Sequence, residues 1–267
     1  MKYVYPAIFS PAEEEVYYMT AQEILQIVQS QLATDLNCTA EDLNGEKDSL
    51  IFAETKNNPG RRPFPRGDSH FEMLSMGKSI VVSATPDILN IGKPLLSGKN
   101  REDAFSMPFV QGHSLYYLPD LARIQPLPPP AEFEYEVIEQ NDIPALYKFD
   151  GFCNAIQYNP NHPRPDVLVI LAKKVGHIVG MAGASADCAK MWQIGMDVMP
   201  QFRGHGLAAY LVNWLTLEIL NRGYVPYYGT ASSNIASQRV AHRVGYYPAW
   251  ICVYKGNFEG FELMPTS

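Results

Sequence analysis

The chain has 267 residues, 46% of them hydrophobic and 18% charged, with a formal net charge of −7. These values predict one large globular domain or two ordinary ones with a sizeable core. The acidic balance argues against a nucleic-acid partner and favours a neutral or cationic small molecule. The longest aliphatic run, residues 167–172, is far shorter than the roughly 20 residues of a membrane helix, so no membrane partner is expected.

The start of the chain and its cysteines indicate a cytoplasmic protein. Residues 1–15 contain a short apolar piece broken by Pro6 and then three glutamates, which predicts no signal peptide. The cysteines are widely spaced and form no C-x-x-C pair, as expected of free thiols in a reducing compartment. They are Cys38, Cys153, Cys188 and Cys252. The six histidines are scattered without ligand-like spacing, so we expect no metal site.

A proline-rich stretch divides the chain. Residues 126–130 contain four prolines, which forbid helix and favour an extended spacer. We therefore predict an N-terminal domain over residues 1–125, a linker over 126–132 and a second domain over 133–267.

The N-terminal domain has an α+β pattern. Thr20 and Glu23 form a capping box that predicts a helix, and residues 79–84 form a buried strand. Pro86 then begins a second helix, while residues 60–70 are expected to form a loop.

The second domain has a stronger periodicity, with the order β-α-β-β-β-α-β-α-β. One strand–helix–strand crossover surrounds its glycine-rich loop. In chain order the expected elements are strand 133–137, a short helix 142–149, strands 166–174, 178–185 and 191–199, helix 204–222, strand 225–231, a helix from 234 that ends at Gly245, and strand 250–254.

The loop before the long helix, VMPQFRGHGLAAYL at residues 198–211, fits two phosphate-binding patterns. Residues 204–209 fit G-x-G-x-x-A of dinucleotide-binding folds, and residues 201–206 fit Q/R-x-x-G-x-G/A of acyl-CoA-binding loops. Both patterns place the backbone N–H groups of a helix N-terminus against phosphate, so the pattern alone does not decide between them.

The residues after the long helix favour the acyl-CoA interpretation. A dinucleotide fold needs an acidic residue about 20 positions after its glycines to hold the ribose hydroxyls. No Asp or Glu occurs from Ile219 to Phe258, which disfavours a nicotinamide oxidoreductase. The same stretch contains basic residues that suit a triply phosphorylated ligand. They are Arg222, Arg239, Arg243 and Lys255.

The combined pattern resembles a known family. The run V-x-P-x-x-R-G-x-G-L-A is followed by a helix, a glycine, a strand, N-x-x-S at Asn234–Ser237 and the pair Gly245–Tyr246. Over Phe133–Tyr254 this is similar to the GNAT superfamily of acyl-CoA-dependent N-acyltransferases. Residues 191–200 and 225–246 further resemble the zwittermicin-resistance-type subgroup. The resemblance implies an α/β fold with a mixed, mostly antiparallel sheet, a splayed parallel strand pair and flanking helices.

The resemblance also implies acetyl-CoA as co-substrate and no metal. Residues 203–208 would hold the diphosphate, and the backbone of the preceding strand would bond the pantetheine and thioester. Asn234 would bond the cofactor, although it also fits the N-cap of a helix. The cofactor-binding residues so implied are Val198, Met199, Arg203, Gly204, His205, Gly206, Leu207, Ala208, Asn234 and Ser237.

The expected chemistry is attack of an amine on the thioester, which requires a base and an acid. Asp197 is the candidate base, because its side chain alternates with Met196 and Val198 beside the loop; alternatively, it caps a loop or pairs with an arginine. Many family members carry a tyrosine acid where this chain has Ala241. His242 and Tyr246 are the candidate substitutes, unless water serves as the acid or the thiolate leaves unaided.

The resemblance implies that residues 151–165 form the acceptor site, where Phe152, Asn154 and Tyr158 fit a small polar amine or, equally, an ordinary loop. The sequence thus predicts an N-acetyltransferase that moves the acetyl group of acetyl-CoA to a small-molecule amine. The alternative is a non-catalytic acyl-CoA sensor or scaffold with the same fold.

The long helix is apolar nearly all round, because only three residues of Leu207–Leu220 are clearly polar. It should therefore be covered on two sides. We expect the sheet on one side and residues 1–125 to supply part of the cover on the other, so that the two domains pack as one rigid body, with a homodimer interface as the competing explanation.

Overall fold

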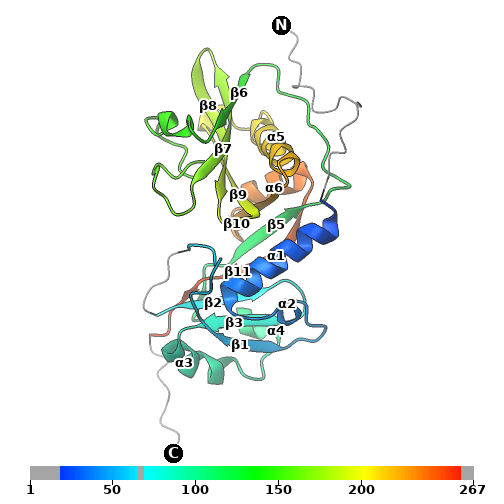
Figure 1. Ribbon diagram of the computed structural model, residues 1–267, viewed down its shortest axis with the longest axis vertical. Coiled ribbons are helices and arrows are strands. Elements are labelled where there is room, and N and C mark those ends of the chain that lie inside the picture. The colour runs from blue at the N-terminus through cyan, green and yellow to red at the C-terminus, as the bar shows by residue number, and fades with distance from the viewer. Residues whose placement is uncertain (1–18, 65–68, 260–267) are drawn as a thin grey trace, which may run out of the picture.

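The computed structural model describes residues 19–64 and 69–259. The prediction about a signal peptide concerns residues 1–15 and lies outside the described residues. Figure 1 shows an elongated molecule with two lobes stacked along its long axis, and strands β5 and β11 in the waist between them.

One sheet of ten strands runs through both lobes in the order β1-β3-β2-β11-β5-β10-β9-β8-β7-β6. The pairs β1–β3 and β9–β10 are parallel and the others are antiparallel. This confirms the predicted α/β fold with a mixed, mostly antiparallel sheet and flanking helices. The strands are β1 Leu50–Glu54, β2 Phe71–Ser75, β3 Ile80–Ala84, β5 Ser114–Pro119, β6 Glu134–Glu139, β7 Asp166–Lys174, β8 His177–Ala186, β9 Met191–Val198, β10 Val225–Ala231 and β11 Tyr246–Val253, with the separate short pair β4 Val110–Gln111 and β12 Lys255–Gly256.

Helix α1 begins where the sequence predicted a cap. The capping box predicted at α1 is formed, because Glu23 N–H donates to Thr20 Oγ1 at 3.1 Å and Thr20 N–H donates to Glu23 Oε2 at 2.7 Å. The helices are α1 Ala21–Leu36, α2 Ala40–Leu43, α3 Pro86–Leu96, α4 Arg101–Phe105, α5 Leu207–Asn221 and α6 Ile235–Val244. None of the helices in the described ranges is long and apolar enough to cross a membrane.

Two predicted elements differ in extent. The short helix predicted at 142–149 is a single 3₁₀ turn, η1 Ile143–Leu146, followed by a further turn. Pro144 has no N–H to donate, and the bond from Tyr147 N–H to its carbonyl, at 3.2 Å, closes a tight turn rather than an α-helix. A second 3₁₀ turn, η2 Pro200–Phe202, precedes α5, which therefore begins at Leu207 rather than at residue 204.

Strand β5 comes from the N-terminal part of the chain but lies in the middle of the sheet. It pairs antiparallel with β10 on one side and with β11 on the other. The far end of β11 then pairs with β2, so the last long strand joins the N-terminal strands. The division predicted between residues 1–125 and 133–267 stays a prediction, and a single sheet crosses it.

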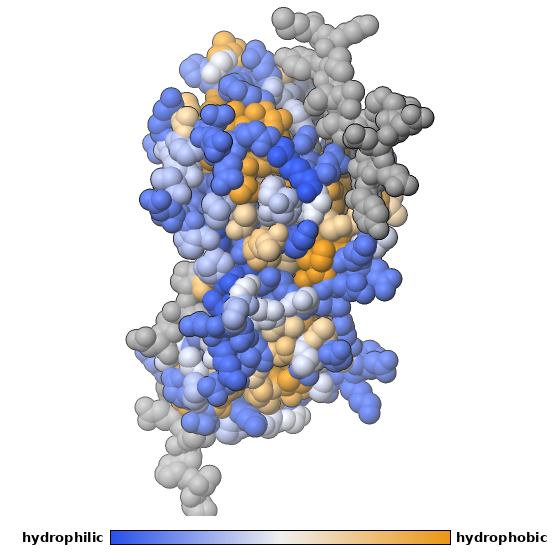
Figure 2. Space-filling view, in the orientation of Figure 1, coloured by the Kyte–Doolittle hydropathy of each residue, from blue (hydrophilic) through white to orange (hydrophobic). Residues whose placement is uncertain are grey.

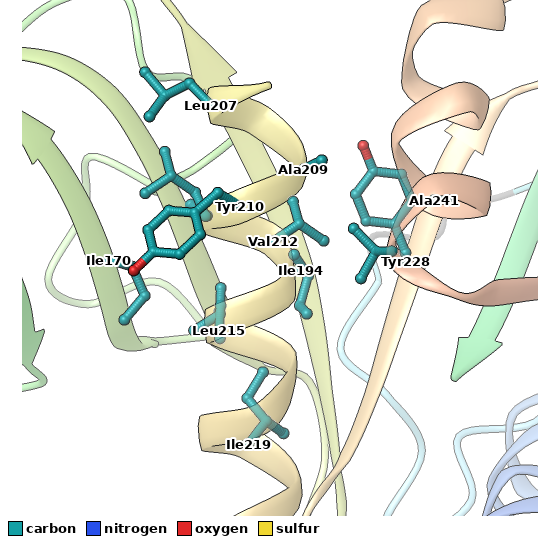
Figure 3. Packing of buried hydrophobic residues seen from close by; sticks show 14 of the residues in the cluster. Ile170, Ile194, Leu207, Ala209, Tyr210, Val212, Leu215, Ile219, Tyr228 and Ala241 are labelled. Carbon is teal, nitrogen blue, oxygen red and sulfur yellow. The ribbon is translucent and has the colours of Figure 1, made fainter. Parts of the chain in front are cut away.

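Helix α5 packs in the largest buried cluster, between the sheet and α6 (Figure 3). Its buried Asn213 accepts from Leu127 N–H at 2.9 Å and donates to the Gln125 carbonyl at 3.1 Å. The second side of α5 is therefore covered by α6 and the proline-rich stretch, and residues up to 125 contribute to this cover, because Asn213 bonds the Gln125 carbonyl and Ile124 packs in the same cluster. Only Leu220, near the end of α5, packs against the cluster that contains α1.

Candidate functional site

Strands β9 and β10 separate partway along their length. They pair in parallel from Val225 with Met191 as far as Tyr228 with Ile194. Beyond this point β9 continues to Val198 and β10 to Ala231 without pairing to each other. The resemblance implied such a splayed pair. The backbone groups on the facing edges of the two strands are not paired with each other beyond this point, and we call the place where the strands part the β9–β10 opening.

The N-terminus of α5 lies beside this opening and offers backbone donors. Gly206 is the N-cap, with a left-handed backbone (φ 79°) and no side-chain cap. Gly204 is also left-handed, with φ 85°, so glycine suits both positions. The N–H groups of the first helical turn have no partner within the helix, and the helix dipole is positive here. This loop is therefore a place where an anion, such as a diphosphate, binds favourably.

Two arginines flank the loop in different ways. Arg203 is turned back, and its Nε donates to the Val198 carbonyl at 3.0 Å, so it holds the loop against the end of β9. Arg243, on α6, lies over the loop, because a Cβ added to Gly206 would be 3.5 Å from Arg243 Nη2. The sequence analysis named Arg243 among the basic residues that suit a phosphorylated ligand but did not place it at this loop. His205 is exposed in the loop, which leaves its predicted contact with phosphate untested.

The start of α6 forms the other side of the opening. Asn234 is the N-cap of α6, and its Oδ1 accepts from Ser237 N–H at 3.1 Å, which is the N-cap role that the sequence left open. The Ser237 hydroxyl in turn lies 2.6 Å from the hydroxyl of Tyr228. Both predicted cofactor-binding residues therefore have local partners, and their contact with a cofactor stays a prediction.

Tyr228 is a functional candidate that the sequence reasoning missed. It is the last residue of β10 that pairs with β9, so it stands where the strands part. Figure 3 shows its ring between α5 and α6, beside Ala241. Both side chains are buried in the same cluster, so the small Ala241 leaves room for this ring. Burial raises the pKa of the Tyr228 hydroxyl, which therefore stays protonated at neutral pH.

The two predicted acids have different surroundings. Tyr246 is fully buried, and its hydroxyl lies 2.8 Å from Thr216 Oγ1 within the core. Burial raises the pKa of this hydroxyl as well. His242 is exposed on α6, where its ring stands edge-on to Tyr117 with the ring centres 5.5 Å apart. Neither side chain has a polar contact that joins it to β9.

Asp197 has three hydrogen-bond donors, all from the predicted acceptor segment, residues 151–165. Its carboxylate accepts from Asn154 N–H at 2.8 Å, from Asn154 Nδ2 at 2.6 Å and from Ala155 N–H at 3.2 Å. These contacts match the loop-capping alternative. A carboxylate offers about four acceptor positions, so one position remains for an incoming amine.

The segment that Asp197 holds lies directly on the sheet, on the face opposite α5. A Cβ added to Gly195 would be 1.8 Å from the Asn154 carbonyl oxygen, and one added to Gly183 would be 1.9 Å from that of Ala155. The glycines on β8 and β9 therefore permit this close approach. Gly180 faces the other way, toward Leu211 of α5.

The three predicted acceptor residues lie in or next to this segment but differ in exposure. Phe152 is 1% exposed and belongs to a buried cluster beneath the segment. Its N–H donates to the hydroxyl of Tyr158 at 3.1 Å, and that hydroxyl donates to the Phe149 carbonyl. Phe152 and Tyr158 therefore hold the segment in shape. Asn154 is exposed, and its role in acceptor binding stays a prediction.

Comparison with known proteins shows a similarity over part of the chain. A family model described as Acetyltransferase (GNAT) family matches part of the chain. Residues 130–246 match the GNAT family. The matched segment runs from the end of the proline-rich stretch to the start of β11, so it contains both strands of the opening, the glycine loop and α6. None of the curated proteins compared with the chain matches it.

Several solved structures of GNAT proteins are similar to this chain. A GCN5-related N-acetyltransferase-like protein from Streptococcus suis is 20% identical, with 68% of this chain and 72% of that chain covered and a TM-score of 0.44. An acetyltransferase from the GNAT family from Colwellia psychrerythraea is 17% identical, covering 60% and 63%, with a TM-score of 0.42. A GCN5-related N-acetyltransferase from Kribbella flavida is 18% identical, covering 55% and 57%, with a TM-score of 0.39.

The match to the GNAT family leaves two points as predictions. The zwittermicin-resistance-type subgroup is one of them, since none of these comparisons names it. The other is the set of site residues, whose geometry is described above. Across residues 19–64 and 69–259, no group of three or more His, Cys, Asp or Glu side chains is placed to hold a metal ion.

Proposed function

We propose that this protein transfers the acetyl group of acetyl-CoA to the amine of a small molecule by direct attack of the nitrogen on the thioester. One observation carries the proposal: the β9–β10 opening lies next to a glycine loop whose helix N-terminus has no side-chain cap. Such a loop suits a diphosphate, and the unpaired edge of β9 offers backbone groups to a pantetheine arm. The match of residues 130–246 to the GNAT family supports the same reaction class.

The reaction needs a proton removed at one end and supplied at the other. A C–N bond forms between the amine and the acetyl carbon, and the C–S bond breaks with its electron pair going to sulfur. The nitrogen loses a proton, for which Asp197 on β9 is the candidate acceptor. The leaving thiolate gains a proton, for which the Tyr228 hydroxyl, bonded to Ser237, is the candidate donor.

Release of free thiol tests the proposal. The full chain is incubated with acetyl-CoA and a panel of amines, and coenzyme A binding is measured separately by calorimetry. We expect micromolar binding of coenzyme A and amine-dependent thiol release. A glycine loop that does not bind coenzyme A would contradict the proposal.

The role of Asp197 is tested by two substitutions. Asp197→Asn removes the proton acceptor, whereas Asn154→Ala removes only the 2.6 Å side-chain bond to it. If Asp197 is the base, Asp197→Asn lowers turnover by about 10²-fold and Asn154→Ala lowers it much less, with coenzyme A affinity kept in both. Equal losses in the two variants would assign Asp197 to positioning of the segment.

A non-catalytic acyl-CoA sensor is the second candidate. The observation that favours it is the engagement of Asp197 with three donors, together with the absence of a side-chain hydroxyl at position 241. Binding of coenzyme A without thiol release, for any amine, would support this candidate. Binding of NAD alone would revive the nicotinamide alternative.

A further inference from the structure

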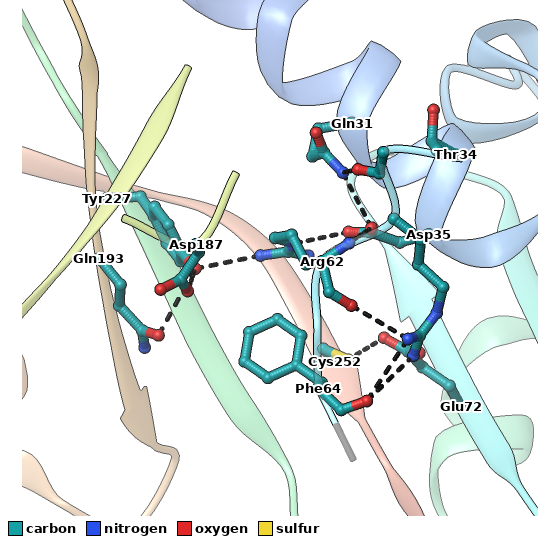
Figure 4. Close-up of polar contacts among 12 residues, drawn as sticks. Gln31, Thr34, Asp35, Arg62, Phe64, Glu72, Asp187, Gln193, Tyr227 and Cys252 are labelled. Carbon is teal, nitrogen blue, oxygen red and sulfur yellow. Dashed lines mark hydrogen bonds and ion pairs between the residues drawn. The ribbon is translucent and has the colours of Figure 1, made fainter. Parts of the chain in front are cut away.

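A large cavity lies at the seam between the two lobes, and sequence analysis did not identify it. It has a volume of about 950 Å³, which is the size of a small-molecule site. Its lining combines the loop after β1, strands β2, β5, β9 and β11, and Arg164. Residues on both sides of the proline-rich stretch therefore form it. Figure 4 shows several of them around Phe64.

One end of the cavity adjoins the β9–β10 opening. Gln193 of β9 and Tyr116 of β5 both line the cavity. A Cβ added to Gly229 would be 2.6 Å from the Tyr116 ring and 3.2 Å from Gln193 Nε2. Gly229 directly follows the last β10 residue that pairs with β9. A molecule in the cavity is thus placed to reach the opening.

Most charges in the cavity wall are paired, and among the described residues Arg61 and the exposed Lys255 and Glu259 have no ion pair. Arg62 Nε contacts Asp35 at 2.5 Å, and Arg164 Nη1 lies 3.6 Å from the buried Asp187. Glu72 lies 3.5 Å from His70 Nε2. Arg61 has no carboxylate within 4.0 Å among the residues that the structure describes, and its Nη1 donates only to backbone carbonyls.

The cavity also collects hydrogen-bond donors that lack acceptors. Within the described part of the chain, four buried side-chain nitrogen or oxygen atoms have no hydrogen-bond partner, and three of them line this cavity. They are Arg61 Nε, Arg164 Nε and His70 Nε2. Because His70 Nε2 lies 3.5 Å from Glu72, the two guanidinium nitrogens are the donors without an acceptor. Buried polar atoms are rarely left unsatisfied, and the two guanidinium nitrogens can only donate. Burial also lowers the pKa of Arg61, so an anion beside it would stabilise its charge. The two guanidinium nitrogens would be satisfied by acceptor oxygens of a ligand.

Aromatic rings form the rest of the wall. The Phe64 ring lies between two guanidinium groups, 5.0 Å from that of Arg62 and 4.8 Å from that of Arg164. Tyr116 and Trp250 stack with their ring centres 5.0 Å apart and 4° between their planes. These surfaces suit an apolar or aromatic group on the same ligand.

We propose that the cavity binds the acceptor, and that the acceptor is an amine that also carries a carboxylate, such as an amino acid. Arg61 binds the carboxylate, the aromatic wall contacts the side chain, and the amine faces the β9–β10 opening. The location as an acceptor site rests on the acetyl transfer proposed above. The unpaired donors in the cavity favour an anionic group on the ligand, whereas the acidic balance of the whole chain by itself favours a neutral or cationic substrate.

A binding experiment tests the cavity without requiring catalysis. Trp192→Phe and Trp214→Phe leave Trp250 as the single tryptophan, in the cavity wall. Its fluorescence is titrated with phenylalanine and with phenethylamine, with coenzyme A present and absent. We expect phenylalanine to give a saturable change in fluorescence. The affinity should be at least about tenfold lower for phenethylamine, and at least about tenfold lower for phenylalanine in Arg61→Gln. Arg123→Gln, an exposed arginine outside the cavity, is the control. Equal binding of both ligands, or no effect of Arg61→Gln, overturns the proposal.

Kinetics separate this proposal from the proposed function. Thiol release from acetyl-CoA is compared for matched pairs: phenylalanine against phenethylamine, and lysine against 1,5-diaminopentane. We expect the carboxylate-bearing member of each pair to have the higher kcat/KM, and Arg61→Gln to remove the difference. Faster reaction of the carboxylate-free members contradicts the substrate class but keeps the acetyl transfer. No coenzyme A binding and no thiol release with any amine contradicts the acetyl transfer, while the fluorescence titration still decides what the cavity binds.

Discussion

The two faces of the sheet beside the β9–β10 opening are built in different ways. On the helical face, the glycine loop, α5 and α6 come from one continuous stretch, residues 203–244. The groups that they present to a ligand are mainly backbone N–H donors. On the opposite face, the cavity is assembled from Arg61, Phe64, Tyr116, Gln193 and Trp250, which lie far apart in the chain. Its offered groups are charged and aromatic side chains.

This difference shows how the two ligands of one reaction place different demands on a fold. A diphosphate is recognised by a local backbone conformation, which a short motif encodes. A specific acceptor is recognised by side chains at defined positions around a cavity, and these can come from any part of the chain. If the cavity binds the acceptor as proposed, the N-terminal lobe supplies the selectivity for the proposed chemistry of residues 130–246.

The largest expected effect comes from separating the two lobes. A chain of residues 131–267 lacks β5, which leaves β10 and β11 without their shared neighbour and removes the buried Tyr117 from the core. We expect this fragment to show no cooperative thermal unfolding by circular dichroism. Co-expression with residues 1–130 should restore it. A fragment that unfolds cooperatively alone would mean that the sheet does not need β5.

Removing the Tyr228 hydroxyl should have the next largest effect. We expect Tyr228→Phe to lower kcat by about 10²-fold with an unchanged Kd for coenzyme A, because a general acid contributes on this scale. Ser237→Ala, which keeps the hydroxyl but removes its partner, should cost less than about tenfold.

The pH profile gives a second measurement on Tyr228. Burial raises its pKa, and an acid is protonated below its pKa, so the proton stays available to a higher pH than for a free tyrosine. The alkaline decline of wild-type kcat should thus lie above pH ~10. A decline already complete at pH 8, or an unchanged kcat in Tyr228→Phe, would remove Tyr228 from the chemistry.

The close approach of the Asn154 backbone to Gly195 is tested by adding a methyl group at position 195. In Gly195→Ala the new Cβ meets the Asn154 carbonyl, a backbone atom, so the segment must move. We expect the free energy of unfolding, measured in urea, to fall by about 1–3 kcal/mol. Gly77→Ala is the control, since its new Cβ would be 3.7 Å from the Leu43 carbonyl oxygen, which is an ordinary van der Waals contact. Equal losses in both variants would point to a general glycine effect.

The smallest effect is expected on the helical face, from the loss of one cation. Arg243→Gln removes the guanidinium beside Gly206 and should raise the Kd for coenzyme A about tenfold, because a charge-assisted bond to phosphate is lost. Calorimetry at low and high salt should show the variant's Kd rising less with salt. Arg203→Gln should instead disturb the end of β9, so its loss should appear in unfolding experiments as well.

The sequence predicted the elements that have strong local signals. The capping box at Thr20, the alternating strands and the glycine loop all depend on neighbours within a few residues. Tyr228 escaped detection because its significance depends on Ala241, which lies next to it only in the folded chain. The cavity could not be predicted for the same reason. That Arg61 has no carboxylate partner is known only when its distances to the carboxylates of the folded chain are known. The place of β5 in the sheet could not be predicted, because strand order is decided by long-range pairing.

The central position of β5 also constrains the synthesis of the protein. Residues 114–119 leave the ribosome well before residues 225–253, which supply both of their hydrogen-bonding neighbours. Until then, β5 has two open edges, which makes the nascent chain prone to aggregate. Folding must therefore finish after translation, and a stop codon that removes β11 would leave β5 with an open edge and disconnect the strands that precede it.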